Sequence, residues 1–348
     1  MIPTVGYAAL AARGDLQPYR FERRELDDTE VLLAILRCGL CHSDVHMVDD
    51  DWGFSPYPLV PGHEIVGRVR AVGPRVDRFR AGDIAAIGCM IDSCRVCRHC
   101  EAGLEQYCDL GPTSTFGGYE PGSQRPIHGG FSSCYVVDQR FAVSVPNGMD
   151  LAAAAPLLCA GITTYSPLRH WKVGRGTPVG VVGIGGLGHL AIKFARAMGA
   201  EVLAITSSAA KRSDAIKLGA HEAIVSGSSD MSGFAGRLDF VLDTVSADHD
   251  IAAMLDLLRT DGTLCMLGLP KSGFKVPPMR LETKRKSIAG SIMGGMAETQ
   301  DMLNFAAVHG IGADVEVMPI ERINEAIARL KRNDVRYRFV LDTSSLSA

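Results

Sequence analysis

The chain has 348 residues, of which 47% are hydrophobic, and its formal net charge is −3. That length supports two domains of ordinary size, and so small a charge provides no field for gathering nucleic acid or an anionic membrane. We therefore expect a small-molecule partner, with no nucleic acid and no membrane. The N-terminus lacks the features of a secretory signal, and no apolar run approaches the roughly 20 residues that span a bilayer, so we expect a cytoplasmic protein.

The first 150 residues read as a compact, mostly β domain. Short β-rich runs at 31–36, 65–72 and 135–137 are separated by Gly and Pro, with no regular alternation of strands and helices.

The ten cysteines are distributed unevenly, and four of them form a CxxCxxC-x7-C pattern: Cys94, Cys97, Cys100 and Cys108. In a cytoplasmic chain such clusters bind metal more often than they form disulfides. Four thiolates in one short loop predict a closed tetrahedral Zn²⁺ site that stabilises without catalysing, although an iron–sulfur site uses the same ligands. His99 lies inside this loop, but four cysteines leave it no vacancy and we expect it to be exposed. We expect the scattered cysteines to be buried as small apolar residues: Cys38, Cys89, Cys134 and Cys265.

From about residue 151 the pattern changes to small-residue helices that alternate with apolar strands. Strands are predicted at 179–182, 202–206, 240–245 and 263–269, an alternation that indicates βαβ units on a parallel sheet. The prediction is a cofactor-binding domain over residues 151–295. The helix-rich stretch 296–348 is expected to pack back on residues 1–150 and complete the first domain.

A glycine-rich turn follows the first of these strands. Its residues are Gly183, Ile184, Gly185, Gly186, Leu187 and Gly188. A GxGxxG between a strand and a helix is the dinucleotide-binding fingerprint: the first glycine makes the tight turn, the second admits the pyrophosphate, and the third allows close helix packing. The following helix has an apolar face through Leu190 and Phe194, and Gly199 can end it.

The residues after the second strand indicate which dinucleotide binds. No acidic residue is present there to hold the ribose hydroxyl of NAD; Ser207, Ser208, Lys211 and Arg212 stand there instead. These hydroxyls and cations suit a 2′-phosphate, so the prediction is NADP(H). The competing interpretation is a solvated basic helix start, which the helix dipole mildly disfavours.

Four further segments, together with the cysteine loop and the glycine turn, occur in the order found in zinc-containing medium-chain alcohol dehydrogenases. Within that family the sequence most resembles the cinnamyl alcohol dehydrogenase type. The segments are 41–46 (CHSDVH), 57–64 (YPLVPGHE), 129–131 (GGF) and 159–168 (CAGITTYSPL). The resemblance extends over nearly the whole chain. It implies an α/β protein with a GroES-like, mostly β catalytic domain and a Rossmann doubly wound parallel-sheet domain.

The resemblance also implies a second, catalytic zinc. Cys41, His63 and Cys159 would be its Cys₂His ligands, with a fourth position open for water or substrate oxygen. The chain would then bind two zinc ions, one catalytic and one structural, and would interconvert an aldehyde and its primary alcohol by hydride transfer with NADP(H).

Roles for neighbouring residues follow from the same resemblance. Ser43 matches the hydroxyl that exchanges a proton with the substrate oxygen, and His46 matches the imidazole that passes it toward solvent. Glu64 matches a carboxylate behind the zinc, and Asp44 one that orients the ligand histidine. Asp51 matches a later relay group, although a solvated acidic turn explains it equally well. The cofactor-contacting positions are His42, for the pyrophosphate, and Thr163, for the nicotinamide.

Several points stay open at this stage. The substrate class spans aromatic aldehydes such as cinnamaldehyde and aliphatic ones, with pocket candidates Trp52, Phe54, Tyr57, Phe116 and Ile292. The rival enzyme is a zinc polyol or secondary-alcohol dehydrogenase. Zinc-free quinone reductases lack both ligand sets, and a zinc-ribbon binding module does not explain the dinucleotide fold. The family implies a homodimer joined through residues 284–296.

Overall fold

The computed structural model describes residues 1–346, which form two compact units. The first contains Met1–Cys159 and Gly294–Ala348, and the second contains Ala160–Met293. Residues 151–159, grouped with the cofactor domain by sequence, cluster with the first unit because their helical turns pack on its strands.

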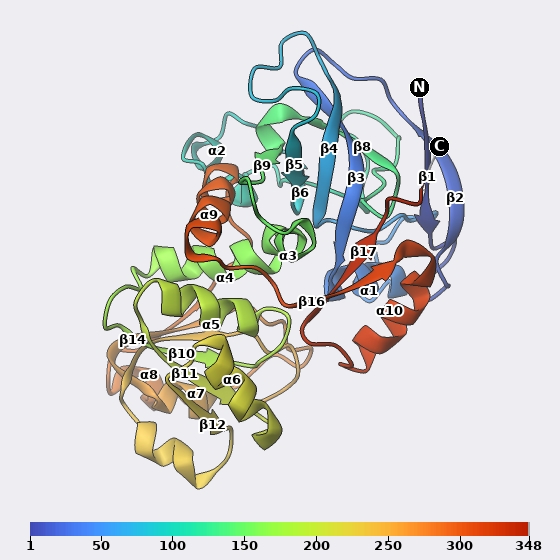
Figure 1. The fold of residues 1–348 in the computed structure, drawn as a ribbon. Coiled ribbons are helices and arrows are strands. Elements are labelled where there is room, and N and C mark those ends of the chain that lie inside the picture. The colour runs from blue at the N-terminus through green and yellow to red at the C-terminus, as the bar shows by residue number, and fades with distance from the viewer. Residues whose placement is uncertain (347–348) are drawn as a thin grey trace. The chain divides into compact units, whose positions relative to one another are not determined.

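The first unit is built on a seven-stranded sheet in the order β16-β17-β3-β4-β5-β9, with β8 also paired to β3 (Figure 1). The strands of the first unit, including the separate pairs β1-β2 and β6-β7, are β1 (Ile2–Ala8), β2 (Gln17–Arg23), β3 (Glu30–Leu40), β4 (Ile65–Val72), β5 (Ile84–Ile87), β6 (Met90–Asp92), β7 (Thr113–Ser114), β8 (Cys134–Asp138), β9 (Val143–Ser144), β16 (Val315–Pro319) and β17 (Arg338–Asp342). Its helical segments are α1 (His42–Asp49), α2 (Arg98–Glu101), η1 (Glu105–Tyr107), η2 (Gln139–Phe141), α3 (Leu151–Ala154), η3 (Ala155–Leu158), α9 (Met296–His309), η6 (Ile320–Arg322) and α10 (Ile323–Lys331).

The C-terminal stretch contributes to this first sheet directly. Strand β17 pairs antiparallel with β3, with Phe339 opposite Leu40 and Leu341 opposite Cys38. Phe339, Leu40 and Cys38 are fully buried and share one apolar cluster, so the two ends of the chain close a single core.

The second unit contains a six-stranded parallel sheet in the order β12-β11-β10-β13-β14-β15. Its strands are β10 (Pro178–Val182), β11 (Glu201–Thr206), β12 (Glu222–Val225), β13 (Leu238–Asp243), β14 (Leu258–Met266) and β15 (Ser287–Gly290). Its helical segments are α4 (Ala160–His170), α5 (Gly188–Ala197), η4 (Ala209–Lys211), α6 (Arg212–Leu218), η5 (Ser229–Phe234), α7 (Ile251–Asp256) and α8 (Met279–Glu282).

This strand order makes the second unit doubly wound, as predicted. From β10 the chain moves one way to β11 and β12, then returns to the other side of β10 with β13, β14 and β15. Right-handed crossovers in opposite directions place helices on both faces of the sheet. The strands are correspondingly apolar on both faces: Val179, Val181, Ile205 and Val241 are completely buried.

Strand β13 ends at Asp243, two residues before the predicted end, because the Asp243 side chain accepts a hydrogen bond from the Val245 amide and turns the chain there. Within residues 1–346 no single helix is long and apolar enough to span a membrane; only the bent pair Leu151–Leu158 and Ala160–His170 passes, by length and composition alone.

Candidate functional site

The first candidate site lies in the first unit and gathers four side chains that are far apart in sequence. Ligand atoms of Cys41, His63, Glu64 and Cys159 all lie within 4.8 Å of one another. Cys41 follows β3 and caps helix α1, the pair His63 and Glu64 precedes β4, and Cys159 follows η3. Two thiols, an imidazole and a carboxylate form a donor set that suits Zn²⁺.

Asp44 holds two of these segments in register. Its carboxylate accepts hydrogen bonds from the amides of Cys41 (2.8 Å) and Gly62 (2.9 Å), and Nδ1 of His63 lies 3.0 Å from Oδ1. Because a carboxylate accepts, Nδ1 carries the proton and Nε2 is left free to bind a metal. Asp44 is 1% exposed, so solvent does not compete for these bonds.

Glu64 is the fourth member of the cluster and is completely buried. One carboxylate oxygen accepts from the Arg338 guanidinium on β17, while Oε2 has no hydrogen-bond partner in residues 1–346. Burial raises the pKa of Glu64 to about 7, although Arg338 opposes the shift. A buried oxygen without a partner is costly, and a cation beside the two thiols would satisfy it. The cluster therefore fits a zinc ion.

The proposed proton relay lies on helix α1, directly after Cys41. The Cys41 thiol donates to Ser43 Oγ at 3.8 Å, and the His42 and His46 ring centroids are 6.5 Å apart. His46 Nδ1 is 2.7 Å from an Asp51 carboxylate oxygen. That contact pairs Asp51 with His46, and it agrees with both interpretations of Asp51 that the sequence left open, a relay group and a solvated acidic turn.

The pocket candidates separate into different environments. Trp52 and Phe54 are exposed by 43% and 64%, stack on each other, and place the Trp52 ring 5.5 Å from that of His46. The buried Phe116 ring stacks 5.7 Å from His63. The Tyr57 hydroxyl instead donates to the Val48 carbonyl at 2.9 Å and fastens the end of α1. Ile292 is half exposed and belongs to the second unit.

The second candidate metal site is the four-cysteine loop, also in the first unit. The sulfurs of Cys94, Cys97, Cys100 and Cys108 lie within 4.8 Å of one another, at 3.5 Å for Cys97–Cys100 and 3.8 Å for Cys94–Cys100. Four sulfurs about 2.3 Å from one ion lie roughly 3.8 Å apart, so the spacing favours a single tetrahedral ion over a multi-iron cluster. The Asp109 amide donates to the Cys97 sulfur, and this bond lowers the pKa of Cys97 to about 6. His99 is only partly exposed and is not one of the four clustered residues.

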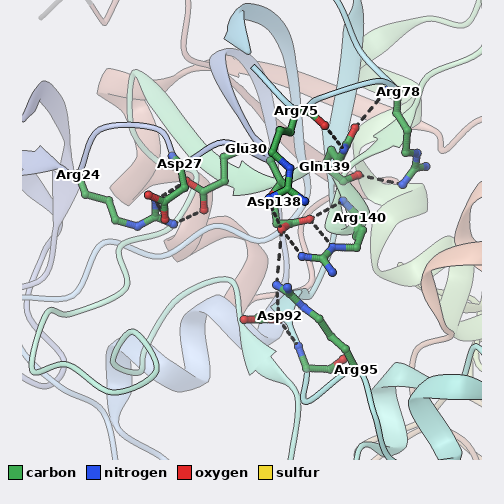
Figure 2. Close-up of polar contacts among 12 residues, drawn as sticks. Arg24, Asp27, Glu30, Arg75, Arg78, Asp92, Arg95, Asp138, Gln139 and Arg140 are labelled. Atoms are coloured by element: carbon green, nitrogen blue, oxygen red, sulfur yellow. Dashed lines mark hydrogen bonds and ion pairs between the residues drawn. The ribbon is translucent and has the colours of Figure 1, made fainter. Parts of the chain in front are cut away.

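A charged network fastens this loop to the sheet (Figure 2). Arg95 bonds Asp92 at 2.8 Å and lies 3.6 Å from Asp138, the last residue of β8, which also binds Arg140 at 2.6 Å. Hydrogen bonds to Arg140 hold the pKa of Asp138 near 2, against the opposing effect of its burial. The loop is thus held by charge as well as by its cysteines.

The glycine turn in the second unit has the geometry that the fingerprint requires. Gly183 has φ of +88°, a conformation that other residues rarely adopt. A Cβ at Gly188 would overlap the Gly183 carbonyl oxygen, whereas a Cβ at Gly185 would meet nothing within 4 Å. Gly186 and Leu187 complete the turn and are partly exposed at the start of α5. The turn therefore needs glycine at both ends and is open in the middle.

The predicted phosphate-binding residues point in two directions. Lys211 Nζ donates to the Ile184 carbonyl in the glycine turn at 3.2 Å, whereas Arg212 Nε donates to the Ala223 carbonyl on β12 at 2.8 Å. Ser207 is exposed and Ser208 half-buried just after β11. Lys211 therefore lies beside the turn, and Arg212 is directed to the sheet edge. Thr163 is partly exposed on α4.

Two residues near the first site were missed by the sequence analysis. Arg338, 3% exposed, pairs with Glu64 from 274 residues away, and no local motif marks it. Cys89 was expected to be fully buried, but it is partly exposed, and its thiol donates to the Leu158 carbonyl at 3.8 Å, beside Cys159. That expectation was wrong for Cys89. Cys38, Cys134 and Cys265 are buried as expected.

Comparisons with known proteins agree with this geometry. Residues 27–147 match the alcohol dehydrogenase GroES-like domain family, and residues 186–308 match the zinc-binding dehydrogenase family. Aldehyde reductase YahK of Escherichia coli is 48% identical over 97% of this chain and 98% of its own length, and a probable mannitol dehydrogenase of Fragaria ananassa is 48% identical over 97% and 94%.

Two solved structures share the fold over 99% of both chains. Cinnamyl alcohol dehydrogenase SbCAD4 of Sorghum bicolor has a TM-score of 0.95 at 44% identity, and CAD of Helicobacter pylori, complexed with NADP(H), has 0.92 at 34%. With both domain families matched and relatives this similar along the whole length, the chain belongs to the zinc-containing medium-chain alcohol dehydrogenases of the cinnamyl alcohol dehydrogenase type.

Proposed function

We propose that this protein is a zinc-dependent, NADP(H)-using alcohol dehydrogenase that interconverts aldehydes, aromatic and aliphatic, with their primary alcohols. The observation that carries the proposal is the convergence of Cys41, His63 and Cys159 with the buried Glu64 carboxylate, their ligand atoms lying within 4.8 Å of one another. Cys41, His63 and Cys159 would hold a zinc ion whose Lewis acidity would polarise the substrate oxygen and so favour hydride exchange with the nicotinamide.

The chain's own residues orient the groups and move the proton. Asp44 fixes the His63 tautomer, so that Nε2 is the coordinating atom. The Ser43 hydroxyl exchanges a proton with the substrate oxygen. Asp51 holds the proton on Nδ1 of His46, which leaves Nε2 as the nitrogen that exchanges protons with solvent.

In the second unit, the turn from Gly183 to Gly188 admits the cofactor pyrophosphate at the start of α5. Ser207, Ser208 and Lys211 hold the 2′-phosphate, because no carboxylate is present at the end of β11 to repel it. The reach of Lys211 to the Ile184 carbonyl supports this assignment. His42 and Thr163 are the remaining proposed cofactor contacts.

Steady-state oxidation of NADPH and, separately, of NADH tests the proposal with cinnamaldehyde and a panel of aliphatic aldehydes. We expect turnover with a strong NADPH preference, lost in Cys159→Ala and kept in Cys265→Ala, which alters a buried cysteine on β14. Equal rates with NADH would contradict the cofactor assignment. Turnover of mannitol with NADP⁺ but of no aldehyde would favour the polyol dehydrogenase alternative, which the mannitol dehydrogenase name of one relative keeps open.

We also propose a cytoplasmic homodimer. Strand β15 is the edge of the parallel sheet, so its outer backbone groups are available to pair with a second copy. Light scattering measures the assembly directly: a dimer mass is expected for the wild type, and a monomer mass for a variant with proline at Ile288 on β15.

A further inference from the structure

The loop that follows β13, residues 244–250, lies at the point where the strand order of the second unit reverses. Strands β11 and β13 lie on opposite sides of β10, and Val182 at the end of β10 pairs with Asp243 at the end of β13. In open parallel sheets, ligands bind in the crevice outside the carboxyl ends of the strands at such a reversal. The glycine turn follows β10 and this loop follows β13, so both lie at the carboxyl ends of the strands that flank the reversal.

The loop and the glycine turn are in direct contact. Thr244 donates to the Val182 carbonyl through its amide (3.0 Å) and its hydroxyl (2.8 Å). A Cβ at Gly183 would lie 2.8 Å from a Val245 methyl group, and one at Gly188 would lie 3.3 Å from the Thr244 hydroxyl. Little space separates the loop from the turn, so a displaced loop would disturb the backbone that receives the pyrophosphate.

An ion pair between the buried Asp243 and the partly exposed His249 holds the loop in this position. Asp243 is completely buried; its Oδ2 is 2.7 Å from Nε2 of His249, and its Oδ1 accepts from the Val245 amide at 3.0 Å. The other nitrogen of His249, Nδ1, is 2.9 Å from the Ala247 carbonyl oxygen. Both ring nitrogens therefore face oxygen acceptors, which requires both to carry protons. When both bonds are made, His249 is an imidazolium that closes the loop onto the end of its own strand.

We propose that His249 is a positioning residue for the dinucleotide: its imidazolium, paired with Asp243, keeps residues 244–250 against the glycine turn and thereby sets the affinity for NADP(H). The inference rests on the proposed function. The proposed role is in binding the dinucleotide, so loss of His249 should change the KM for NADPH and not the kcat of the hydride step.

The charges around His249 give this device a pH dependence. The hydrogen bond to Asp243 raises the pKa of His249, with the Ala247 carbonyl and the charge of Asp250 acting in the same direction and burial opposing them. Asp248, the other acid of the loop, accepts a hydrogen bond from Ser272. The stabilisation that the charged His249 provides is fully present below the ordinary histidine pKa of about 6.5. It is lost as the pH rises through the raised pKa of His249. NADPH affinity should therefore weaken toward alkaline pH.

The test compares three variants with wild type by titrating NADPH fluorescence from pH 6 to 9 and by measuring KM and kcat. His249→Ala should weaken NADPH binding about tenfold, or about 1.4 kcal/mol, and raise the KM for NADPH while kcat at saturation stays unchanged. His249→Gln keeps one N–H donor for Asp243 but cannot titrate, so its affinity should be intermediate and flat with pH. His170→Gln, an exposed histidine in the same unit, should behave as wild type.

Two results would overturn the inference alone: wild-type affinity in His249→Ala at every pH, or a wild-type pH profile in His249→Gln. If His249→Ala does not fold, the His249→Gln profile still decides. A wild-type protein that binds neither NADPH nor NADH would overturn the proposed function and this inference together.

Discussion

Around the candidate catalytic zinc, single hydrogen bonds decide which atoms can coordinate. Asp44 accepts from two amides and from His63, and an asparagine there cannot accept all three, because its amide nitrogen is a donor. We expect Asp44→Asn to weaken zinc binding at this site roughly 10- to 100-fold, as loss of a partner of a metal ligand typically does.

Competition with a chromophoric chelator measures that affinity for each of the two zinc ions. The exposed Asp15 supplies the matched control, since Asp15→Asn changes the same group without a buried bond. Equal zinc affinity in Asp44→Asn and wild type would remove the proposed role of Asp44.

His128 provides a pH-dependent prediction at the same scale. It is 7% exposed, its Nδ1 has no hydrogen-bond partner in residues 1–346, and burial, with help from Arg23, lowers its pKa to about 4. The unfolded chain binds a proton there near pH 6.5 and the folded chain does not, so stability falls as the pH drops from about 6.5 toward 4.

His128→Phe removes that proton linkage and keeps an aromatic ring against Phe21, 4.5 Å away. We expect the variant to match wild type at pH 7.5 and to exceed it by roughly 1–2 kcal/mol in unfolding free energy at pH 5. Urea unfolding at both pH values tests this, and an identical difference at the two pH values would show that His128 is not the linked group.

At the scale of elements, the turn between β11 and α6 separates two neighbouring cations. Lys211 reaches the glycine turn, whereas Arg212 bonds the backbone of β12. We expect Lys211→Ala to raise the KM for NADPH about tenfold, equivalent to about 1.4 kcal/mol, because it removes a charge-assisted bond to the 2′-phosphate. The KM for NADH should stay unchanged.

Arg212→Ala is the matched control in the same kinetic assay. Arg212→Ala should lower the melting temperature, because the Arg212 Nε bonds the Ala223 carbonyl. Any change in KM should be equal for NADPH and NADH. A selective loss of NADPH in Arg212→Ala but not in Lys211→Ala would reverse the assignment.

The elements themselves were predictable to different degrees. Strand β4 lies exactly where an apolar run between Gly and Pro residues predicts it, and β10 and β11 are one residue longer than predicted at their starts. Helix α5 is amphipathic as expected: Leu190 and Phe194 are completely buried, and Arg196 on the other face is exposed. Tyr165 of α4 packs on Phe194 within the second unit. Periodicity indicates which face is apolar, but the packing of another helix decides how much of the remainder is covered.

For the whole molecule, two metal sites in one unit should fail independently. We expect Cys97→Ser and Cys159→Ala each to leave one zinc ion per chain, measured by atomic emission. Cys97→Ser should lower the melting temperature by several degrees, because the apolar side chains of the loop, Val96, Leu104 and Tyr107, are exposed and contribute little packing. Cys159→Ala should abolish turnover with a smaller thermal effect. Loss of both ions in either variant would show that the sites are coupled.

Several features followed from the sequence by itself, because each depends on residues close together in the chain. The glycine turn, the four-cysteine loop, the alternating strands of the second unit and the absence of an acid after β11 are all of this kind. A tight turn or a closed metal loop is specified by local stereochemistry and ligand spacing. The catalytic ligand set is different: Cys41, His63 and Cys159 were selected by family resemblance, since single residues scattered over 118 positions have no spacing signal of their own.

The tertiary structure decided the contacts that join distant segments. It brought Arg338 from β17 onto Glu64, placed Cys89 beside Cys159, and grouped residues 151–159 with the first unit. It also closed the loop after β13 through Asp243 and His249. These residues carry no local pattern that separates them from ordinary polar or apolar positions. Arg338 reaches Glu64 only when β17 pairs antiparallel with β3, and the loop after β13 meets the glycine turn only when β13 pairs with β10.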